Sequence, residues 1–319
     1  MRAMRIEALG QPLVMADVPA PVPGPGEALL RVHACGLNFA DTLMAAGRYQ
    51  EKPPLPFAPG IEVCGTVVAL GPGVAAPAVG TRVAGLCGSG GLAELVALPA
   101  DACAPVPDGL DDEAAAGFLI AYGTSHVALA YLARLRPGET LLVTGAAGGV
   151  GLTAVELGAL LGARVLAVVR GGDRRAVAAA AGAVMSFDPN EDVAAAVKAA
   201  GGADVVYDTV GGALFDACLR AAKPGARLLP IGFAGGEVPQ IPANRLLVRN
   251  QTAIGFYFGG WVRAHPALAR ASLETLLAWY RLGRLRPHVG RVLPLAEAEA
   301  GLALLRDRGA SGKIVVRIA

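Results

Sequence analysis

The sequence predicts an α/β protein in which a doubly wound parallel sheet is joined to a second, mostly β domain. The stretch Thr140–Arg170 alternates an apolar run, a glycine cluster, a helical segment and a second apolar run, which is the pattern of a βαβ unit. From about residue 119 onward such runs alternate with Ala-rich segments, whereas the residues before it form short apolar runs broken by Gly and Pro. A chain of 319 residues is long enough for two domains of this kind.

The mostly β domain is expected over residues 1–118. Its candidate strands are the short apolar runs Ala28–His33, Glu62–Leu70, Thr81–Ala84 and Ala93–Ala97. The Pro- and Gly-rich segment 19–26 predicts a stiff loop before the first of them. A last apolar run, Lys313–Ile318, is expected to return to this domain, so that residues 261–319 complete it.

The second domain is expected over residues 119–260, as a parallel sheet with helices between its strands. Leu141–Val143 and Arg164–Val169 are the two strands of the first βαβ unit. The later candidate strands are Val184–Phe187, Val205–Tyr207, Arg227–Ile231 and Ala253–Tyr257. The candidate helices are 174–181, 192–200 and 212–222, and a further helix is predicted at Pro266–Leu282.

The glycine cluster lies where the first strand turns into its helix. A dinucleotide pyrophosphate binds at such a turn because backbone N–H groups at a helix N-terminus are accessible there. The usual G-x-G-x-x-G pattern has Ala at its first position here, and an extra glycine precedes it. We favour a dinucleotide site over a plain glycine-rich turn, with contacts from Gly145, Ala147, Gly148, Gly149, Val150 and Gly151.

The end of the second strand indicates which dinucleotide binds. NAD enzymes usually place an Asp or Glu there to hold the ribose 2′-hydroxyl, whereas this chain has Arg170. A guanidinium suits a 2′-phosphate, so we expect NADPH as the cofactor. Two alternatives stay open: the arginines of this loop are ordinary solvated charges, or Asp173 holds a ribose hydroxyl.

Composition excludes several partner classes. A net charge of +2 gives no basis for binding nucleic acid or anionic lipid. The longest uncharged apolar stretch, between Glu113 and Arg134, contains Gly, Thr, Ser and His, which fit a buried helix and turn better than a membrane span. The N-terminal segment MRAMRIEALG lacks the apolar core of a signal peptide. We therefore expect a cytoplasmic protein.

The cysteines and histidines predict no metal site and no disulfide framework. The chain has five cysteines, and no two of them form a C-x-x-C pair. None of the four histidines is spaced with another His or Cys as a zinc site requires.

Five motifs occur in one order along the chain: PGPGEALLRV at 23–32, GLNFADT at 36–42, GRY with LPFAPG at 47–60, GAAGGVG at 145–151 and YDTVGG at 207–212. This series resembles the zinc-independent quinone oxidoreductase (zeta-crystallin-like) family of medium-chain dehydrogenases/reductases. The resemblance implies a GroES-like catalytic domain, a Rossmann domain and a homodimer that pairs through the strand at 253–257.

The resemblance also implies a site without zinc. Zinc-dependent relatives have Cys where Asn38 stands and His where Ile61 stands, and an amide and an aliphatic side chain cannot form a tetrahedral zinc site. Without a Lewis acid, an electron-poor acceptor such as a quinone or an enone is easier to reduce than an alcohol or a simple ketone.

Three residues are expected to be catalytic by this resemblance. Asn38 is expected to donate a hydrogen bond to the acceptor oxygen, Tyr49 to supply a hydrogen bond or a proton, and Thr124 to lie near the nicotinamide. Structural alternatives stay open: a turn amide for Asn38, a packing aromatic for Tyr49 and a helix N-cap for Thr124. Asp41 is equally compatible with a site or a turn.

Other cofactor contacts follow from the resemblance. Arg174 aligns with a family lysine that serves the 2′-phosphate, whereas the family tyrosine of the next loop is replaced by Pro189. Gly232 and Phe233 are expected along the nicotinamide ribose. Phe256 and Phe258 are expected as a pocket wall, with core packing as the alternative, and Lys313 as a phosphate contact or a surface lysine.

The function expected from these features is NADPH-dependent reduction of a small-molecule quinone or similarly electron-poor acceptor, mainly by positioning the reactants. The first alternative is an enoyl-thioester or enone reductase of the same fold. The second is a binding or structural protein that retains NADPH without turnover, as crystallin relatives do.

Overall fold

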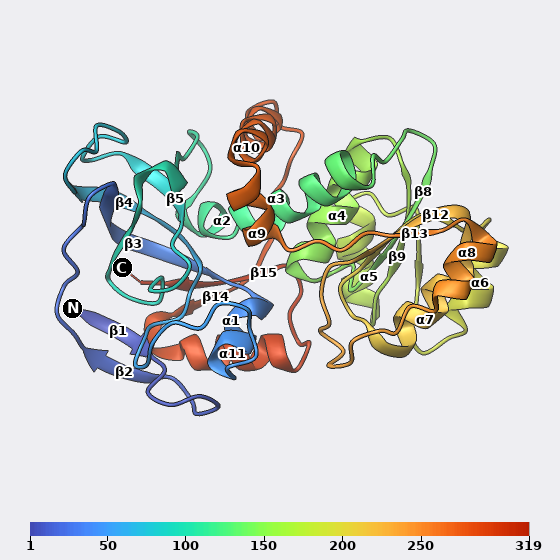
Figure 1. Cartoon of the computed structure of the whole chain (residues 1–319), viewed down its shortest axis with the longest axis horizontal. Coiled ribbons are helices and arrows are strands. Elements are labelled where there is room, and N and C mark those ends of the chain that lie inside the picture. Colours follow the sequence, from blue (N-terminus) through green and yellow to red (C-terminus); the bar gives the residue numbers. More distant parts are fainter. Residues whose placement is uncertain (319) are drawn as a thin grey trace. The chain divides into compact units, whose positions relative to one another are not determined.

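The computed structural model describes residues 1–318, which form two compact units (Figure 1). Unit 1 comprises residues 1–120 and the chain from Pro287 onward, and unit 2 comprises Ala121–Arg286. The predicted boundary at residue 118 lies close to the observed one. The second predicted boundary, which gave residues 261–319 to the first domain, is wrong, because residues 261–286 belong to unit 2.

The corrected boundary has a physical cause in helix α10 (Pro266–Arg281), which packs on α3 (Leu119–His126) within unit 2. The Ser272 hydroxyl lies 2.7 Å from His126 Nδ1, and the Trp279 and His126 rings meet edge to face with centroids 5.2 Å apart. The apolar periodicity of this segment predicts a helix that ends one residue beyond the observed one, but it does not specify the surface against which the helix packs.

Unit 1 contains a largely antiparallel sheet in the order β14-β15-β3-β4-β5-β7, with β6 also paired to β3. The strands are β3 (Glu27–Leu37), β4 (Glu62–Leu70), β5 (Arg82–Leu86), β6 (Leu95–Pro99), β7 (Cys103–Pro105), β14 (Val289–Pro294) and β15 (Lys313–Arg317). A separate sheet pairs β1 (Arg2–Arg5) with β2 (Val14–Asp17). The helices are α1 (Phe39–Ala45), α2 (Asp112–Ala116) and α11 (Ala298–Arg306), with 3-10 turns at Ala100–Ala102 and Leu295–Glu297.

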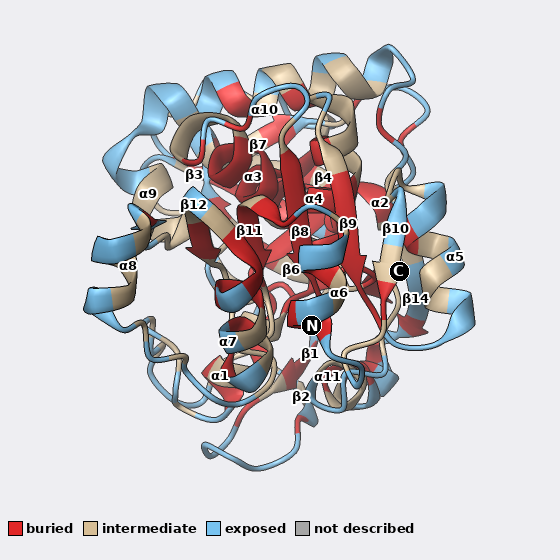
Figure 2. Cartoon of the chain, turned by 90° about the vertical axis from the view of Figure 1, so that its right-hand side faces the viewer, coloured by how far each residue is buried: buried red, intermediate tan, exposed pale blue. Residues whose placement is uncertain are grey.

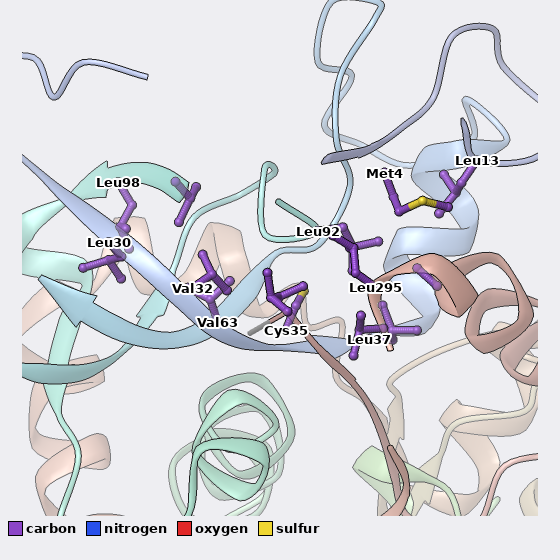
Figure 3. Close-up of a cluster of buried hydrophobic side chains, with 14 of the residues drawn as sticks. Met4, Leu13, Leu30, Val32, Cys35, Leu37, Val63, Leu92, Leu98 and Leu295 are labelled. Atoms are coloured by element: carbon purple, nitrogen blue, oxygen red, sulfur yellow. The ribbon is translucent and has the colours of Figure 1, made fainter. Parts of the chain in front are cut away.

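The C-terminal strand confirms that the chain returns to the first domain. Strand β15 lies between β14 and β3, and it runs antiparallel to β3 with Val316 opposite Cys35. Because side chains alternate along a strand, Leu30 and Val32 of β3 both enter the core, where they pack in one cluster with Val63 of β4 (Figure 3). The core of unit 1 therefore depends on segments from both ends of the sequence.

Unit 2 contains the predicted parallel sheet, in the order β10-β9-β8-β11-β12-β13. Its strands are β8 (Thr140–Thr144), β9 (Arg164–Val168), β10 (Met185–Phe187), β11 (Ala203–Asp208), β12 (Ala222–Pro230) and β13 (Thr252–Ala253). From β8 the chain proceeds outward through β9 and β10, then crosses to β11 and proceeds outward through β12 and β13 on the other side. The doubly wound topology is confirmed, and its switch point lies between β8 and β11.

Helices connect the strands of unit 2. They are α4 (Gly149–Leu160), α5 (Gly172–Ala180), α6 (Val193–Ala199), α7 (Gly212–Ala221) and α8 (Ala243–Arg249). The helix α9 (Phe258–Ala264) follows the last strand, and α3 continues as a π-helical segment at Val127–Leu132. Figure 2 shows β8, β9 and β11 as buried over most of their length, as the uninterrupted apolar runs of a parallel sheet require. No helix within residues 1–318 combines the length and the apolar character needed to cross a membrane.

The predicted strand Ala253–Tyr257 is wrong in extent. Pairing with β12 ends at Ala253, which lies opposite Leu228, and both residues of β13 are exposed. Beyond it, the Phe258 ring packs on α3, because a Cβ at Gly123 would lie 2.6 Å from Phe258 Cζ. The residue directly after the predicted strand, Phe258, therefore begins α9 and packs on a helix.

His126 gives a pH test of the packing of α10. The His126 side chain is almost completely buried, and burial lowers its pKa from 6.5 to about 4. Because the unfolded chain binds a proton near pH 6.5, the stabilisation from neutral His126 is complete above that pH and is lost as the pH falls through about 4. We expect the urea-unfolding free energy of wild type, minus that of His126→Gln, to fall by about 3 kcal/mol between pH 7 and pH 4. A difference independent of pH would contradict this burial.

Candidate functional site

The glycine turn after β8 is packed so closely that Gly145 and Gly151 have no room for a side chain. Gly145 has φ +58°, and a Cβ on it would lie 2.3 Å from Thr209 Oγ1. A Cβ on Gly151 would lie 2.2 Å from the carbonyl oxygen of Gly145. The predicted reason for Gly151, close packing of the helix on the strand, is thereby confirmed.

The turn presents backbone N–H groups at the start of α4. Gly148 is the N-cap of this helix, and no side chain caps it. The turn residues Gly145, Gly148, Gly149 and Val150 are partly exposed, whereas the methyl groups of Ala146 and Ala147 are buried beneath them. An accessible, uncapped N-terminus on a helix of 12 residues fits a pyrophosphate.

A buried carboxylate joins the ends of β8 and β11 at the switch point. Asp208 Oδ1 accepts a hydrogen bond from the Thr144 hydroxyl at 2.5 Å, and Asp208 Oδ2 accepts one from the Gly211 N–H at 2.8 Å. The Thr209 hydroxyl donates to the Thr144 carbonyl at 2.9 Å. Burial raises the pKa of Asp208. Sequence reasoning did not identify Asp208 and Thr144 as a pair, although the YDTVGG motif marked one partner.

The segment after β12 lies beside this junction. The Ile231 N–H donates to the Asp208 carbonyl at 2.7 Å, and the Gly232 N–H donates to the same oxygen at 3.3 Å. A Cβ on Gly211 would lie 3.2 Å from Phe233 Cδ1. The structure therefore brings the predicted Gly232 and Phe233 to the same sheet edge as the glycine turn.

The basic residues lie at the carboxyl end of β9, the neighbour of β8. Arg170 is exposed just beyond this strand, and Arg174 lies in the first turn of α5. Arg175 forms an ion pair with Asp188, with its NH2 nitrogen 3.2 Å from Asp188 Oδ2. Asp188, the acidic residue beside Pro189, is thus paired with Arg175. That Arg170 and Arg174 bind a 2′-phosphate stays a prediction.

Thr124 lies within α3, so the N-cap alternative for it is wrong. The neighbouring Gly123 contacts Phe258, and the rings of Phe258 and Phe256 are 6.3 Å apart in an edge-to-face arrangement. Phe256, Phe258 and the helix that carries Thr124 therefore form one packed group within unit 2.

Unit 1 contains a buried polar triad at the predicted Asn38. Lys313 Nζ lies 2.6 Å from Asn38 Oδ1 and 2.6 Å from Glu62 Oε1. Asn38 Nδ2 donates to Glu62 Oε1 at 3.0 Å and to the Gly36 carbonyl at 3.2 Å. Glu62 is completely buried, and the exposed fraction of Lys313 is only 6%. We call Lys313, Glu62 and Asn38 the Lys–Glu–Asn triad.

Two sequence alternatives are corrected by this triad. Lys313 is not a surface lysine, and its ammonium contacts Asn38 and Glu62, a geometry that gives no support to the expected phosphate contact. Neither Asn38 nor Glu62 was predicted to contact Lys313, because both residues are distant from Lys313 in the sequence. In the sequence, Glu62 stands out only as the first residue of the candidate strand Glu62–Leu70.

Asp41 is part of the same buried region. Its Oδ2 accepts the Asn38 N–H at 2.7 Å, and its Oδ1 accepts the Gly60 N–H at 3.0 Å. Burial raises the pKa of Asp41 from 3.8 to about 6, and the two backbone donors oppose this shift. Asp41 therefore fixes the start of α1, which carries Asn38 as its N-cap, and the turn reading of this residue is the one that its contacts support.

Tyr49 lies half-buried after α1, and its catalytic role stays a prediction. Within residues 1–318, no group of three or more His, Cys, Asp and Glu side chains is placed to hold a metal ion. The five cysteines are free thiols.

Comparisons with known proteins cover the whole chain. The family described as "Alcohol dehydrogenase GroES-like domain" matches residues 24–108, and the family described as "Zinc-binding dehydrogenase" matches residues 149–276. The chain is 39% identical to "Quinone oxidoreductase-like protein 2 homolog" of Nematostella vectensis, over 99% of this chain and 88% of the relative.

Two solved structures are similar over their full length. One is the quinone oxidoreductase of Thermus thermophilus, solved alone and with NADPH, which is 41% identical with a TM-score of 0.87 and full coverage of both chains. The other is a mycobacterial protein complexed with NADPH, 33% identical with a TM-score of 0.94, again with full coverage of both chains.

Substitutions at two glycines test the tight turn. Gly151→Ala places a methyl group 2.2 Å from the Gly145 carbonyl oxygen, so we expect it to lower the free energy of unfolding by about 1–3 kcal/mol. Gly172→Ala is the matched control, because α5 has nothing within 4 Å of the new methyl group. The control should be neutral or slightly stabilising, and thermal unfolding of both variants is the measurement. Equal melting temperatures for the two variants would contradict the packing described.

Proposed function

The chain belongs to the quinone oxidoreductase family of medium-chain dehydrogenases/reductases, and on this basis we propose that it transfers hydride from NADPH to a quinone or a similarly electron-poor acceptor. The observation that carries the proposal is the series of groups along the carboxyl edge of the unit 2 sheet. An uncapped glycine turn follows β8, and two arginines follow the neighbouring β9.

The cofactor assignment rests on the charge and the backbone of this edge. The N–H groups of Gly148, Gly149 and Val150 are suited to the pyrophosphate, and Arg170 and Arg174 are suited to a 2′-phosphate. Bound NADPH supplies a hydride. Asp208 keeps the glycine turn and the segment at Gly232 in register, since its side chain and carbonyl bond to both sides of the switch point.

The acceptor class follows from the side chains at the zinc positions of relatives. Asn38 and Ile61 offer an amide and an aliphatic group, which do not form a zinc site. The chain then stabilises a developing negative charge by hydrogen bonds alone, and an electron-poor acceptor requires the least of such stabilisation. Asn38, Tyr49 and Thr124 are the proposed hydrogen-bonding and positioning groups. A homodimer that pairs through β13, the terminal strand of its sheet, is proposed from the family resemblance.

Steady-state oxidation of NADPH tests the acceptor class. We expect kcat/KM for p-quinones to exceed that for 2-enoyl thioesters by at least about tenfold, because a quinone accepts hydride with less polarisation of its oxygen. Faster turnover of the thioester would instead support the enoyl-thioester reductase. Tight NADPH binding without oxidation by either acceptor would support a binding or structural protein.

The 2′-phosphate assignment has a separate test. We expect the double variant Arg170→Ala with Arg174→Ala to raise the KM for NADPH by about one to two orders of magnitude while the KM for NADH changes little, because a charge-assisted phosphate contact is lost. Arg220→Ala, at an exposed position of α7, is the control for each single variant, because it also removes one positive charge. An unchanged ratio of the two KM values in the double variant would refute the assignment.

A further inference from the structure

The hydrogen bonds of the Lys–Glu–Asn triad leave the Asn38 amide without a spare hydrogen. Both Nδ2 hydrogens have acceptors, Glu62 Oε1 and the Gly36 carbonyl, and Oδ1 accepts from the Lys313 ammonium. A reversed amide would place NH₂ against the ammonium and oxygen against the carboxylate, so this orientation is fixed by chemistry. To donate to a substrate, Asn38 must release one of the two acceptors.

Glu62 can release Asn38 because its carboxylate keeps other donors. Its carboxylate receives three donors: Lys313 Nζ at 2.6 Å and Asn38 Nδ2 at 3.0 Å on Oε1, and the Ile120 N–H at 3.1 Å on Oε2. The bond from the neutral Asn38 amide is longer than the bond from the ammonium to the same oxygen. Without it, Glu62 still has a cation and a backbone donor, so its buried charge remains paired.

We propose that Lys313 is a positioning residue that acts through Asn38. Its ammonium orients and polarises the Asn38 amide and neutralises the Glu62 carboxylate. One Nδ2–H group of Asn38 can then redirect its hydrogen bond from Glu62 to the oxygen of the hydride acceptor. This inference rests on the proposed function. It assigns a role to Lys313 that is different from a cofactor contact.

Polarisation follows from the direction of the bonds. A cation that donates to Oδ1 draws electron density toward the amide oxygen and makes the Nδ2 hydrogens stronger donors, as in other chains of hydrogen bonds in a buried setting. The oxygen of a quinone gains negative charge as hydride arrives, so a stronger donor stabilises the transition state more than the ground state.

The aliphatic stem of Lys313 occupies space that Gly117 leaves free because it has no side chain. A Cβ on Gly117, the C-cap of α2, would lie 2.5 Å from Lys313 Cγ. A Cβ on Gly36 would lie 2.2 Å from the Ala116 carbonyl oxygen and 3.1 Å from Glu62 Oε1, so a side chain there would disturb the backbone as well as the triad. Gly117→Ala therefore displaces the ammonium without removing any polar group of the triad.

A cycle of variants tests the proposal. Lys313→Met combined with Glu62→Gln removes both charges, so that no unpaired ion remains buried. We expect this pair to lower kcat/KM for the quinone by about tenfold to a hundredfold, with the Kd for NADPH changed less than about twofold. In an Asn38→Ala background the same pair should cause no further loss, because its effect passes through Asn38. Lys198→Met, an exposed lysine of α6, is the matched control.

Independent losses that multiply in the combined variant would overturn the proposal, as would wild-type kcat/KM in the Lys313→Met, Glu62→Gln pair. A raised Kd for NADPH with unchanged kcat would indicate that Lys313 contacts the cofactor, and it would overturn the proposal. If the pair fails to fold, Gly117→Ala replaces it, and we expect a severalfold loss that is absent in the Asn38→Ala background.

A binding measurement separates this inference from the proposed function. The Kd of the quinone for the protein without NADPH, followed by tryptophan quenching, should rise severalfold in the pair and in Asn38→Ala. A wild type that binds the quinone but does not oxidise NADPH would refute the proposed function, whereas the change in Kd would still decide the role of Lys313. A Kd that is the same in wild type and variants, or no binding by wild type, would overturn the inference.

Discussion

Unit 2 depends on a contact between two pieces of backbone, at Gly145 and Gly151. Their approach leaves no space for a side chain, and it brings α4 so close to β8 that the helix begins at the sheet edge. The exposed N–H groups, the arginines beyond β9 and the segment beyond β12 all take their positions from this edge. The proposed cofactor site is built on backbone and strand order, which tolerate changes in most of the side chains around them.

Unit 1 is constrained by two charged side chains in its interior, those of Glu62 and Lys313. Glu62 and Lys313 are both buried and form an ion pair. Glu62 also accepts hydrogen bonds from Asn38 and the Ile120 N–H, and Lys313 also donates one to Asn38. Such a network is costly when any member is missing, since the remaining charge is left without water or partner. The same network orients and polarises the Asn38 amide, because this amide lies between the Lys313 cation and the Glu62 anion.

Local patterns in the sequence predicted much of this arrangement. The apolar runs gave β4 with the observed ends, and glycine spacing located the turn before α4. The predictions that failed concern contacts between segments that are distant in the sequence. A strand was expected at Ala253–Tyr257, yet pairing with β12 ends at Ala253 and the next residue beyond this range, Phe258, packs on α3. Lys313 was expected at a phosphate or at the surface, because no local signal shows that β15 brings it to Asn38, which is 275 residues away.

The position of β15 also bears on how the protein is made. This strand is inserted between β14 and β3, so the sheet of unit 1 has an open interior edge on β3 until β15 leaves the ribosome. Unit 2, which is continuous in sequence, has all its strands available earlier. Synthesis from the N-terminus therefore produces the start of unit 1 first and completes its sheet only after unit 2 has emerged. During that interval Glu62 lacks its cation, and the nascent chain exposes a strand edge open to mispairing.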